Sequence, residues 1–247
     1  MSLIDASRAL CTAVDALSFG APAAYTYNPL AYAHEAHELF LARYGDGRAP
    51  GRVLLVGMNP GPFGMGQTGV PFGDIVAAKE WMGLYAKVEQ PPTWHPKRPI
   101  LGYESTRREG SGKRLWGWAE ERWGSADAFF DDFFVHNYCP LWFTEGSGRN
   151  LIPEKLKKAE RVPLLAACDQ ALRDVVTAVN PRAIVGVGKF AEKRAHAVFS
   201  DSASSVGDVP IHCILHPSPA NPRANKNWIG EVEPVLRGLG VRIPGAS

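Results

Sequence analysis

Short apolar runs rich in β-branched residues alternate along the chain with longer segments whose apolar positions recur every three or four residues. The short runs predict buried strands and the longer segments predict helices. Alternating strands and helices favour a parallel sheet with right-handed crossovers and helices on both faces, so we predict the α/β class. We place strands at 52–56, 133–137, 183–187 and 210–215, and helices at 3–18, 30–44, 74–86, 113–123, 160–178, 189–199 and 227–238.

Length and composition fit one globular domain over residues 1–247, with residues 1–50 as a helical preface. A chain of this size can bury about 70–75% of its unfolded surface in a single core. No apolar run approaches the roughly 18 residues of a membrane span, and residues 1–6 lack the basic-then-apolar order of a secretory signal. We therefore expect no membrane partner and an intracellular location, in the cytoplasm or nucleoid of a bacterium or the nucleus of a eukaryote.

The four cysteines are far apart in the sequence. Cys11, Cys139, Cys168 and Cys213 form no C-x-x-C pair, and the last three lie in apolar contexts that are typical of core thiols. This spacing argues against an iron–sulfur cluster and against a zinc site, so we expect no cofactor and no metal.

The net charge is only +2, so the distribution of basic residues is more informative than their sum. Basic residues gather at 154–161, at 95–98, and at Arg223 and Lys226. Taken alone, such clusters are more typical of solvated helix faces than of a surface that binds a polyanion.

Two loops rich in proline and glycine, 57–73 and 216–226, each follow one of the predicted strands. Asn59 and His216 consequently stand where the carboxyl ends of two strands open into loops. In an open parallel sheet this edge is where ligands bind. The second loop is stiffened by its prolines and carries Arg223, Asn225 and Lys226, so it has the shape and charge of a wedge that could enter a nucleic-acid groove.

The first loop resembles the phosphate-binding G-x-x-x-x-G-K-[ST] pattern, but Gln67 stands where the lysine must meet the phosphate charge. Pro60 and Pro62 also remove two backbone N–H groups that a phosphate cradle needs. We therefore reject a phosphate site. The glycines of this loop instead predict a close approach of the backbone to a flat ligand.

The histidines differ in their surroundings. His34 and His37 are spaced to share a helix face, which we expect to be solvated rather than to bind a metal. His136 and His212 lie within apolar strands, where an imidazole is more often a satisfied interior group than a catalyst. His216 stands at the rim of the sheet on a backbone with little freedom, and it is the candidate for chemistry.

Taken together, these residues resemble the single-strand-selective monofunctional uracil-DNA glycosylase family of the uracil-DNA glycosylase superfamily. Residues 57–65 look like the family's first motif, 67–73 like its continuation and 216–226 like its second motif, and the similarity covers roughly residues 50–240. The resemblance implies a three-layer α/β/α sandwich around a four-stranded parallel sheet of order 2-1-3-4. It also implies a DNA repair enzyme that flips uracil out of DNA and hydrolyses its N-glycosidic bond, leaving an abasic site.

The resemblance implies two catalytic residues. Asn59 is too weak to act as a base, and it would hold the attacking water against the sugar carbon. His216 would donate a hydrogen bond to uracil O2 as negative charge develops there, with help from the backbone of Met58. Relatives with a stronger water activator have aspartate in the first motif, where this chain has Asn59.

Three further residues are implied to recognise the base. The amide of Asn137 would meet uracil O4 and N3–H, a pattern that cytosine inverts. Phe72 would stack on the flipped base. Gly61 would line the space near uracil C5, which in this family admits oxidised substituents such as hydroxymethyl.

The resemblance assigns DNA contacts to two segments, and we expect the protein to be a monomer. Residues 217–226 would supply the wedge that replaces the flipped base, and residues 147–161 would contact phosphates. Vertebrate relatives have arginine where Ala220 stands, so we expect weaker strand insertion, with Arg223 as a partial substitute. The expected DNA contacts are Ser147, Gly148, Arg149, Asn150, Lys155, Lys157, Lys158, Pro217, Ser218, Pro219, Arg223, Asn225 and Lys226.

Three alternatives remain open from the sequence. The first is a glycosylase of the same fold that acts mainly on deaminated purines such as xanthine or hypoxanthine. The second is a non-catalytic protein that binds damaged bases, since no carboxylate occupies the water-activating place. The third is a hydrolase of free nucleotides, whose activity would depend weakly on salt.

Overall fold

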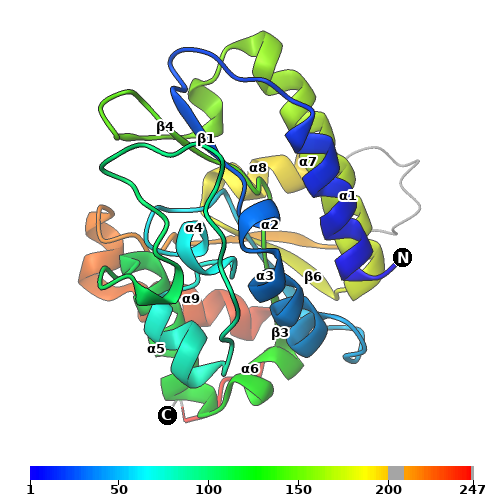
Figure 1. Ribbon diagram of the computed structural model, residues 1–247. Helices are drawn as coiled ribbons and strands as arrows, with labels where there is room; N and C mark the ends of the chain where they lie inside the picture. The colour runs from blue at the N-terminus through cyan, green and yellow to red at the C-terminus, as the bar shows by residue number, and fades with distance from the viewer. Residues whose placement is uncertain (200–208, 246–247) are drawn as a thin grey trace.

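A four-stranded parallel sheet forms the centre of the molecule (Figure 1). The computed structural model describes residues 1–199 and 209–245 of the chain. The sheet consists of β2 (Val53–Gly57), β3 (Phe133–Asn137), β6 (Ala183–Val187) and β7 (Ile211–Ile214), in the order β3-β2-β6-β7. Counted along the chain, this is the predicted order 2-1-3-4. All neighbouring pairs are parallel, so the four carboxyl ends share one edge.

Helices cover both faces of the sheet, which confirms the three-layer α/β/α architecture. On one face α1 (Leu3–Asp15) lies alongside α7 (Lys158–Val179), and α8 (Lys189–Phe199) packs against α7 (Figure 1). On the other face α5 (Gly110–Trp123), α6 (Ala126–Asp132) and α9 (Pro222–Gly238) meet in an aromatic cluster, in which the ring of Trp118 meets those of Phe129 and Trp228 edge to face. The sheet faces are buried because every residue of β2 and β6 is apolar or glycine.

The helices and short helical turns account for most of the remaining described chain. They are α1 (Leu3–Asp15), α2 (Pro29–Tyr32), α3 (His34–Phe40), η1 (Leu41–Gly45), α4 (Met65–Thr68), η2 (Ala77–Trp81), η3 (Gly102–Glu104), α5 (Gly110–Trp123), α6 (Ala126–Asp132), η4 (Pro153–Lys155), α7 (Lys158–Val179), α8 (Lys189–Phe199) and α9 (Pro222–Gly238).

Several helix boundaries differ from the prediction. The segment 30–44 is interrupted at Ala33, whose φ and ψ of −117° and 28° leave the helical region. The segment 74–86 ends early, because Gly83 adopts a φ of +64° directly after Met82. The last helix begins at Pro222 rather than 227, and a kink at Asn227 separates its first turn from the rest. Part of the predicted wedge loop is therefore helical.

A small antiparallel sheet was not predicted at all. It contains β1 (Tyr25–Tyr27), β4 (Trp142–Thr144) and β5 (Asn150–Leu151), in the order β1-β4-β5. These strands have only two or three residues each, and β1 and β4 pair across more than a hundred residues of chain. Such pairing leaves no local pattern. The sheet matters because it holds the tight turn between β4 and β5 in place.

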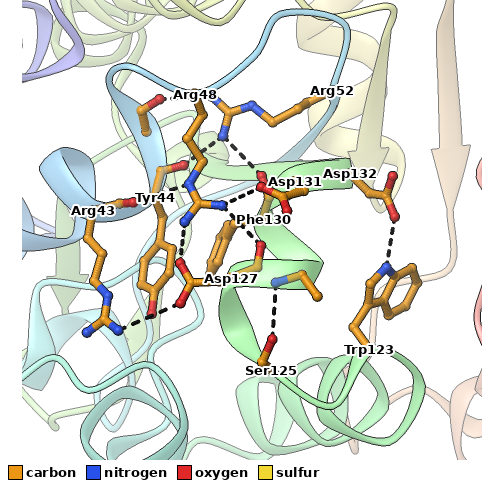
Figure 2. A network of polar contacts seen from close by, with 12 residues as sticks. Arg43, Tyr44, Arg48, Arg52, Trp123, Ser125, Asp127, Phe130, Asp131 and Asp132 are labelled. Atoms are coloured by element: carbon orange, nitrogen blue, oxygen red, sulfur yellow. Dashed lines mark hydrogen bonds and ion pairs between the residues drawn. The ribbon is translucent and has the colours of Figure 1, made fainter.

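A network of arginines fastens the amino end of the sheet, opposite the edge that carries Asn59 (Figure 2). Arg48 forms ion pairs with Asp127 and Asp131 of α6, the second at 2.6 Å. Arg52 is 2% exposed, and its guanidinium donates to the backbone carbonyls of Tyr44 (2.7 Å) and Gly45. These contacts join η1, β2 and α6, so the start of the central strand is fixed independently of its functional end.

Candidate active site

The residues predicted to act on the base lie around one cavity at the carboxyl edge of the sheet. Asn59 follows β2 and His216 follows β7, two strands of one parallel sheet. The cavity has a volume of about 170 Å³. All six predicted residues line it: Met58, Asn59, Gly61, Phe72, Asn137 and His216. The structure therefore brings together every side chain that the sequence placed at the base.

Gly57 allows the two base-recognising residues to converge. Asn137 is the last residue of β3 and stands directly opposite Gly57 in the parallel pair. A Cβ on residue 57 would collide with Asn137 Oδ1 and would lie 2.6 Å from Phe72 Cε2. Only glycine leaves room for both side chains at this end of β2.

Phe72 is held in a backbone conformation that is rare for an aromatic residue, with a φ of +53°. Two hydrogen bonds to its carbonyl oxygen stabilise this conformation, from the indole Nε1–H of Trp116 (2.9 Å) and from the backbone N–H of Asp74 (2.7 Å). The ring is 8% exposed and its centroid lies 6.0 Å from that of His216. Strain of this kind, maintained by neighbouring groups, is typical of functional sites.

The amide of Asn137 is almost fully buried, with 5% of its surface exposed. Its Nδ2 donates to the Met65 sulfur at 3.2 Å. This contact fixes which end of the amide is nitrogen, and a second N–H and the carbonyl oxygen remain for a ligand. A planar base with an acceptor next to a donor on one edge fits that pair.

The amide of Asn59 also engages the protein through its nitrogen. Its Nδ2 lies 3.3 Å from two backbone carbonyl oxygens, those of Pro60 and Leu141. Both contacts engage the nitrogen, so Oδ1 is left as the group that can accept a hydrogen bond from a water. An amide oxygen can orient that water but cannot remove its proton.

The hydrogen bonds around His216 define its tautomer. The backbone N–H of Ser218 donates to Nδ1 at 3.1 Å, so the ring proton resides on Nε2. Burial of the ring lowers the pKa of His216 below its usual value of 6.5. A neutral imidazole is therefore available near neutral pH, and its Nε2–H is a donor without positive charge.

Glu109 is a pocket residue that the sequence reasoning missed. It lines the cavity beside Gly61, and it caps α5 by accepting a long hydrogen bond from the Ser111 N–H, 3.4 Å. Glutamate is not among the residues that usually cap a helix start, which is consistent with the prediction of this helix from 113 only. The sequence held no signal that this cap faces the base pocket, because the connection from 82 to 109 has no regular pattern.

The second loop is fastened to α5 by Arg114, another residue that was not predicted. Its guanidinium donates to the Pro217 carbonyl (3.0 Å) and to Asn225 Oδ1 (2.8 Å). Asn225 in turn donates to the Pro219 carbonyl at 2.7 Å. The exposed Arg223 folds back onto its own helix in an ion pair with Glu231, so it does not extend toward the position beside Ala220.

The other predicted DNA-contacting segment also reaches the cavity. Ser147, Gly148 and Arg149 form the turn between β4 and β5, and Asn150 and Leu151 line the pocket mouth. Two side chains from the segment 95–98 support this turn through its backbone carbonyls: His95 Nε2 lies 2.9 Å from Gly146 O, and Arg98 Nε lies 2.9 Å from Gly148 O. Lys155, Lys157 and Lys158 are exposed just beyond it.

Three other histidines have environments that differ from the prediction. His37 does not share a solvated face with His34: it is 5% exposed, contacts the Gly69 carbonyl at 2.8 Å, and burial lowers its pKa to about 4. Burial lowers the pKa of His136 to about 3, and its buried Nε2 has no hydrogen-bond partner among the described residues. The interior imidazole is therefore not satisfied as expected. His212 is only half-buried.

Within residues 1–199 and 209–245, no group of three or more histidine, cysteine, aspartate or glutamate side chains is placed to hold a metal ion. No helix in the same part of the chain is both long and apolar enough to cross a membrane. All four cysteines are free thiols, and Cys139 and Cys168 are buried.

Comparison with known proteins identifies the family. The family model of the uracil DNA glycosylase superfamily matches residues 44–237. The chain is 44% identical over 225 residues to the single-strand selective monofunctional uracil DNA glycosylase of Bos taurus, covering 91% of this chain and 81% of that protein. It is 45% identical to the corresponding protein of Rattus norvegicus, covering 91% of this chain and 79% of that protein.

A solved structure supports the fold. The crystal structure of wild-type Pedobacter heparinus SMUG2 superposes with a TM-score of 0.64 at 19% identity, covering 95% of this chain and 97% of that one. The match to the superfamily spans both loops that line the cavity, and the high identity to the mammalian proteins extends over most of the chain. The chain belongs to the uracil DNA glycosylase superfamily and, within it, to the single-strand selective monofunctional uracil-DNA glycosylase family.

Proposed function

We propose that this chain is a monofunctional DNA glycosylase that removes uracil from DNA by hydrolysing its N-glycosidic bond. The observation that carries the proposal is the single cavity in which a neutral imidazole donor, two amides of fixed polarity and a stacking ring converge. The cavity is small enough to enclose one base and sits between two loops suited to contact a DNA strand.

The reaction requires stabilisation of separated charge. As the bond breaks, uracil leaves as an anion and positive charge grows on the sugar. His216 supplies an Nε2–H donor to O2 of the departing base, and one such donor is typically worth about 10²–10³ in rate. Asn59 Oδ1 holds a water against the sugar carbon, so its contribution is positioning rather than proton removal.

Recognition rests on Asn137 and Phe72. The free N–H of Asn137 pairs with uracil O4 and its carbonyl oxygen with N3–H, whereas cytosine presents the reverse pattern. Stacking on Phe72 contributes about 1–3 kcal/mol for any base. Gly61 borders the remaining side of the cavity. We extend the proposal to uracils with an oxidised 5-substituent, such as 5-hydroxymethyluracil.

DNA is held by the two segments at the cavity mouth. The loop that Arg114 fastens acts as the wedge that occupies the vacated place, and flipping costs a few kcal/mol, least for an unpaired base. The turn between β4 and β5 and the exposed lysines beyond it contact phosphates. We further propose that the protein acts as a monomer inside the cell.

The test is release of base from oligonucleotides that each carry one defined lesion: uracil, 5-hydroxymethyluracil, xanthine or hypoxanthine. Uracil release by the wild type supports the proposal, whereas release of the purines without uracil points to the purine-specific alternative. Binding without alkali-sensitive sites in the DNA would indicate a damage-binding protein instead.

Two variants assign the chemistry. Asn59→Ala and His216→Leu should each lose most turnover while they retain DNA binding. His34→Leu, which changes an exposed histidine outside the cavity, is the matched control and should retain both. An equal loss of binding and turnover in the first two variants would argue that the residues serve folding rather than catalysis.

A further inference from the structure

Glu109 places a carboxyl group over the two glycines of the first loop. A Cβ on Gly61 would collide with Glu109 Oε2, and a Cβ on Gly64 would lie 3.0 Å from Glu109 Cγ. The carboxyl group therefore fills the space directly above this loop and forms part of the cavity wall that also contains Asn137 and His216.

The two oxygens of this carboxyl group have different surroundings. Oε1 accepts the long hydrogen bond from the Ser111 N–H. Oε2 has no ion-pair partner among the described residues and is the oxygen nearest to Gly61, and the hydroxyl of Ser111 also lies close to the carboxyl group. Burial raises the pKa of Glu109 above its usual value, only partly offset by the bonds from Ser111. Oε2 is not among the fully buried oxygens without a partner, so a donor that enters the cavity can reach it.

Uracil itself cannot supply that donor. Within DNA its ring carries a single N–H, at N3, and the sugar has no 2′-hydroxyl. In the proposed pose N3–H is already paired with Asn137. The donor must therefore be a water or a hydroxyl group attached to the base.

We propose that Glu109 determines which substituted uracils enter the pocket: its Oε2 accepts a hydrogen bond from a neutral, hydroxyl-bearing substituent and repels an anionic one. With plain uracil a water fills the same place. This inference rests on the proposed glycosylase activity. It adds the residue that distinguishes substituents on uracil by their charge and by their ability to donate a hydrogen bond. Phe72 cannot do so, because stacking is insensitive to such groups.

An alternative role for the same carboxylate must be distinguished from this one. In that role Glu109 would be a general base that activates the attacking water. The two roles predict different effects on the ratios of rates. Loss of the charge changes the rate on a substituted uracil relative to plain uracil if Glu109 sorts substituents. It lowers the rates on all bases equally if Glu109 is a general base.

The experiment measures single-turnover rates of the full-length protein on three single-stranded oligonucleotides that differ in one base: uracil, 5-hydroxymethyluracil and 5-carboxyuracil. The variants are Glu109→Gln, which keeps the shape and the helix cap without the charge, and Glu109→Ala. Ser125→Ala, which removes the cap of α6 far from the cavity lining, controls for loss of a helix cap alone.

With Glu109→Gln we expect the rate on 5-carboxyuracil relative to uracil to rise about tenfold, the effect of one interaction with a charged group. With Glu109→Ala we expect the rate on 5-hydroxymethyluracil relative to uracil to fall about tenfold. Ser125→Ala should change neither ratio.

Unchanged ratios in both variants would overturn the inference, and so would an equal fall on all three bases in Glu109→Gln, which would identify a general base. Because the readout is a ratio to uracil, a loss of stability that lowers all rates together in Glu109→Ala does not imitate the effect. Failure of the wild type to release uracil would instead refute the proposed function.

Discussion

Gly57→Ala is the substitution that most directly tests how the fold builds the pocket. The new methyl group would lie 2.6 Å from Phe72 Cε2, whereas ordinary contact begins at 3.4 Å, so the ring or the strand must move by about 0.8 Å. Asn137 Oδ1 must move as well. Overpacking of this kind costs about 1–3 kcal/mol of stability. A misplacement near 1 Å at reacting groups can lower a rate about 10²-fold.

The assay is single-turnover uracil release combined with thermal unfolding. We expect a loss of about 10²-fold in rate with a Tm decrease of about 2–4 °C for each kcal/mol, so that the variant is folded at the assay temperature. Gly117→Ala is the matched control, because nothing lies within 4 Å of its new Cβ in α5. It should leave the rate unchanged and stabilise the helix by about 0.5–1 kcal/mol. A Gly57→Ala protein with a rate within twofold of wild type would refute the reasoning.

Three more results are expected. The unfolded chain takes up a proton on His37 below pH 6.5, but the folded protein takes it up only near pH 4. The free energy of unfolding should therefore fall by about 3 kcal/mol as the pH is lowered through that window. Urea unfolding of wild type and His37→Gln measures this, and an equal dependence of the unfolding free energy on pH in both proteins would contradict it. Asn137→Asp should weaken the preference for uracil over cytosine. An unchanged substrate profile in base-release assays would show that Asn137 does not recognise the base. Arg114→Ala should slow uracil release more from duplex than from single-stranded DNA, because only the duplex needs a rigid wedge; equal slowing of both would count against the wedge.

The sheet could be predicted from the sequence because its signal is local. Each core strand is a short apolar run, and the helices between them carry their own periodicity, so the element types follow without knowledge of the fold. The antiparallel sheet of β1, β4 and β5 could not be predicted, since its strands are two or three residues long and the β1–β4 pair joins residues separated by more than a hundred positions. The same holds for His37, whose burial results from packing against the first loop at Gly69.

The site shows a similar division. Asn59 and His216 could be identified because each follows a recognisable strand, and parallel strands bring their carboxyl ends to one edge. Asn137 was assigned through the family resemblance, and it stands at the end of β3 at the same edge. Glu109 and Arg114 were missed because they reach the cavity and the second loop from α5, after a connection whose course is fixed only by tertiary contacts. Sequence patterns thus located the groups on the sheet but not the groups that face them from the helical layer.

The tautomer of His216 follows from the three residues His-Pro-Ser. Because Pro217 has no N–H, the first backbone donor after the ring is that of Ser218, and it bonds Nδ1. The chain contains the same arrangement a second time, where the Lys97 N–H donates to His95 Nδ1 at 3.0 Å across Pro96. There Nε2 is left as the donor and meets a carbonyl oxygen, that of Gly146, at 2.9 Å. His95 therefore makes, within the protein, the same kind of Nε2–H contact to a carbonyl oxygen that His216 is proposed to make with uracil O2.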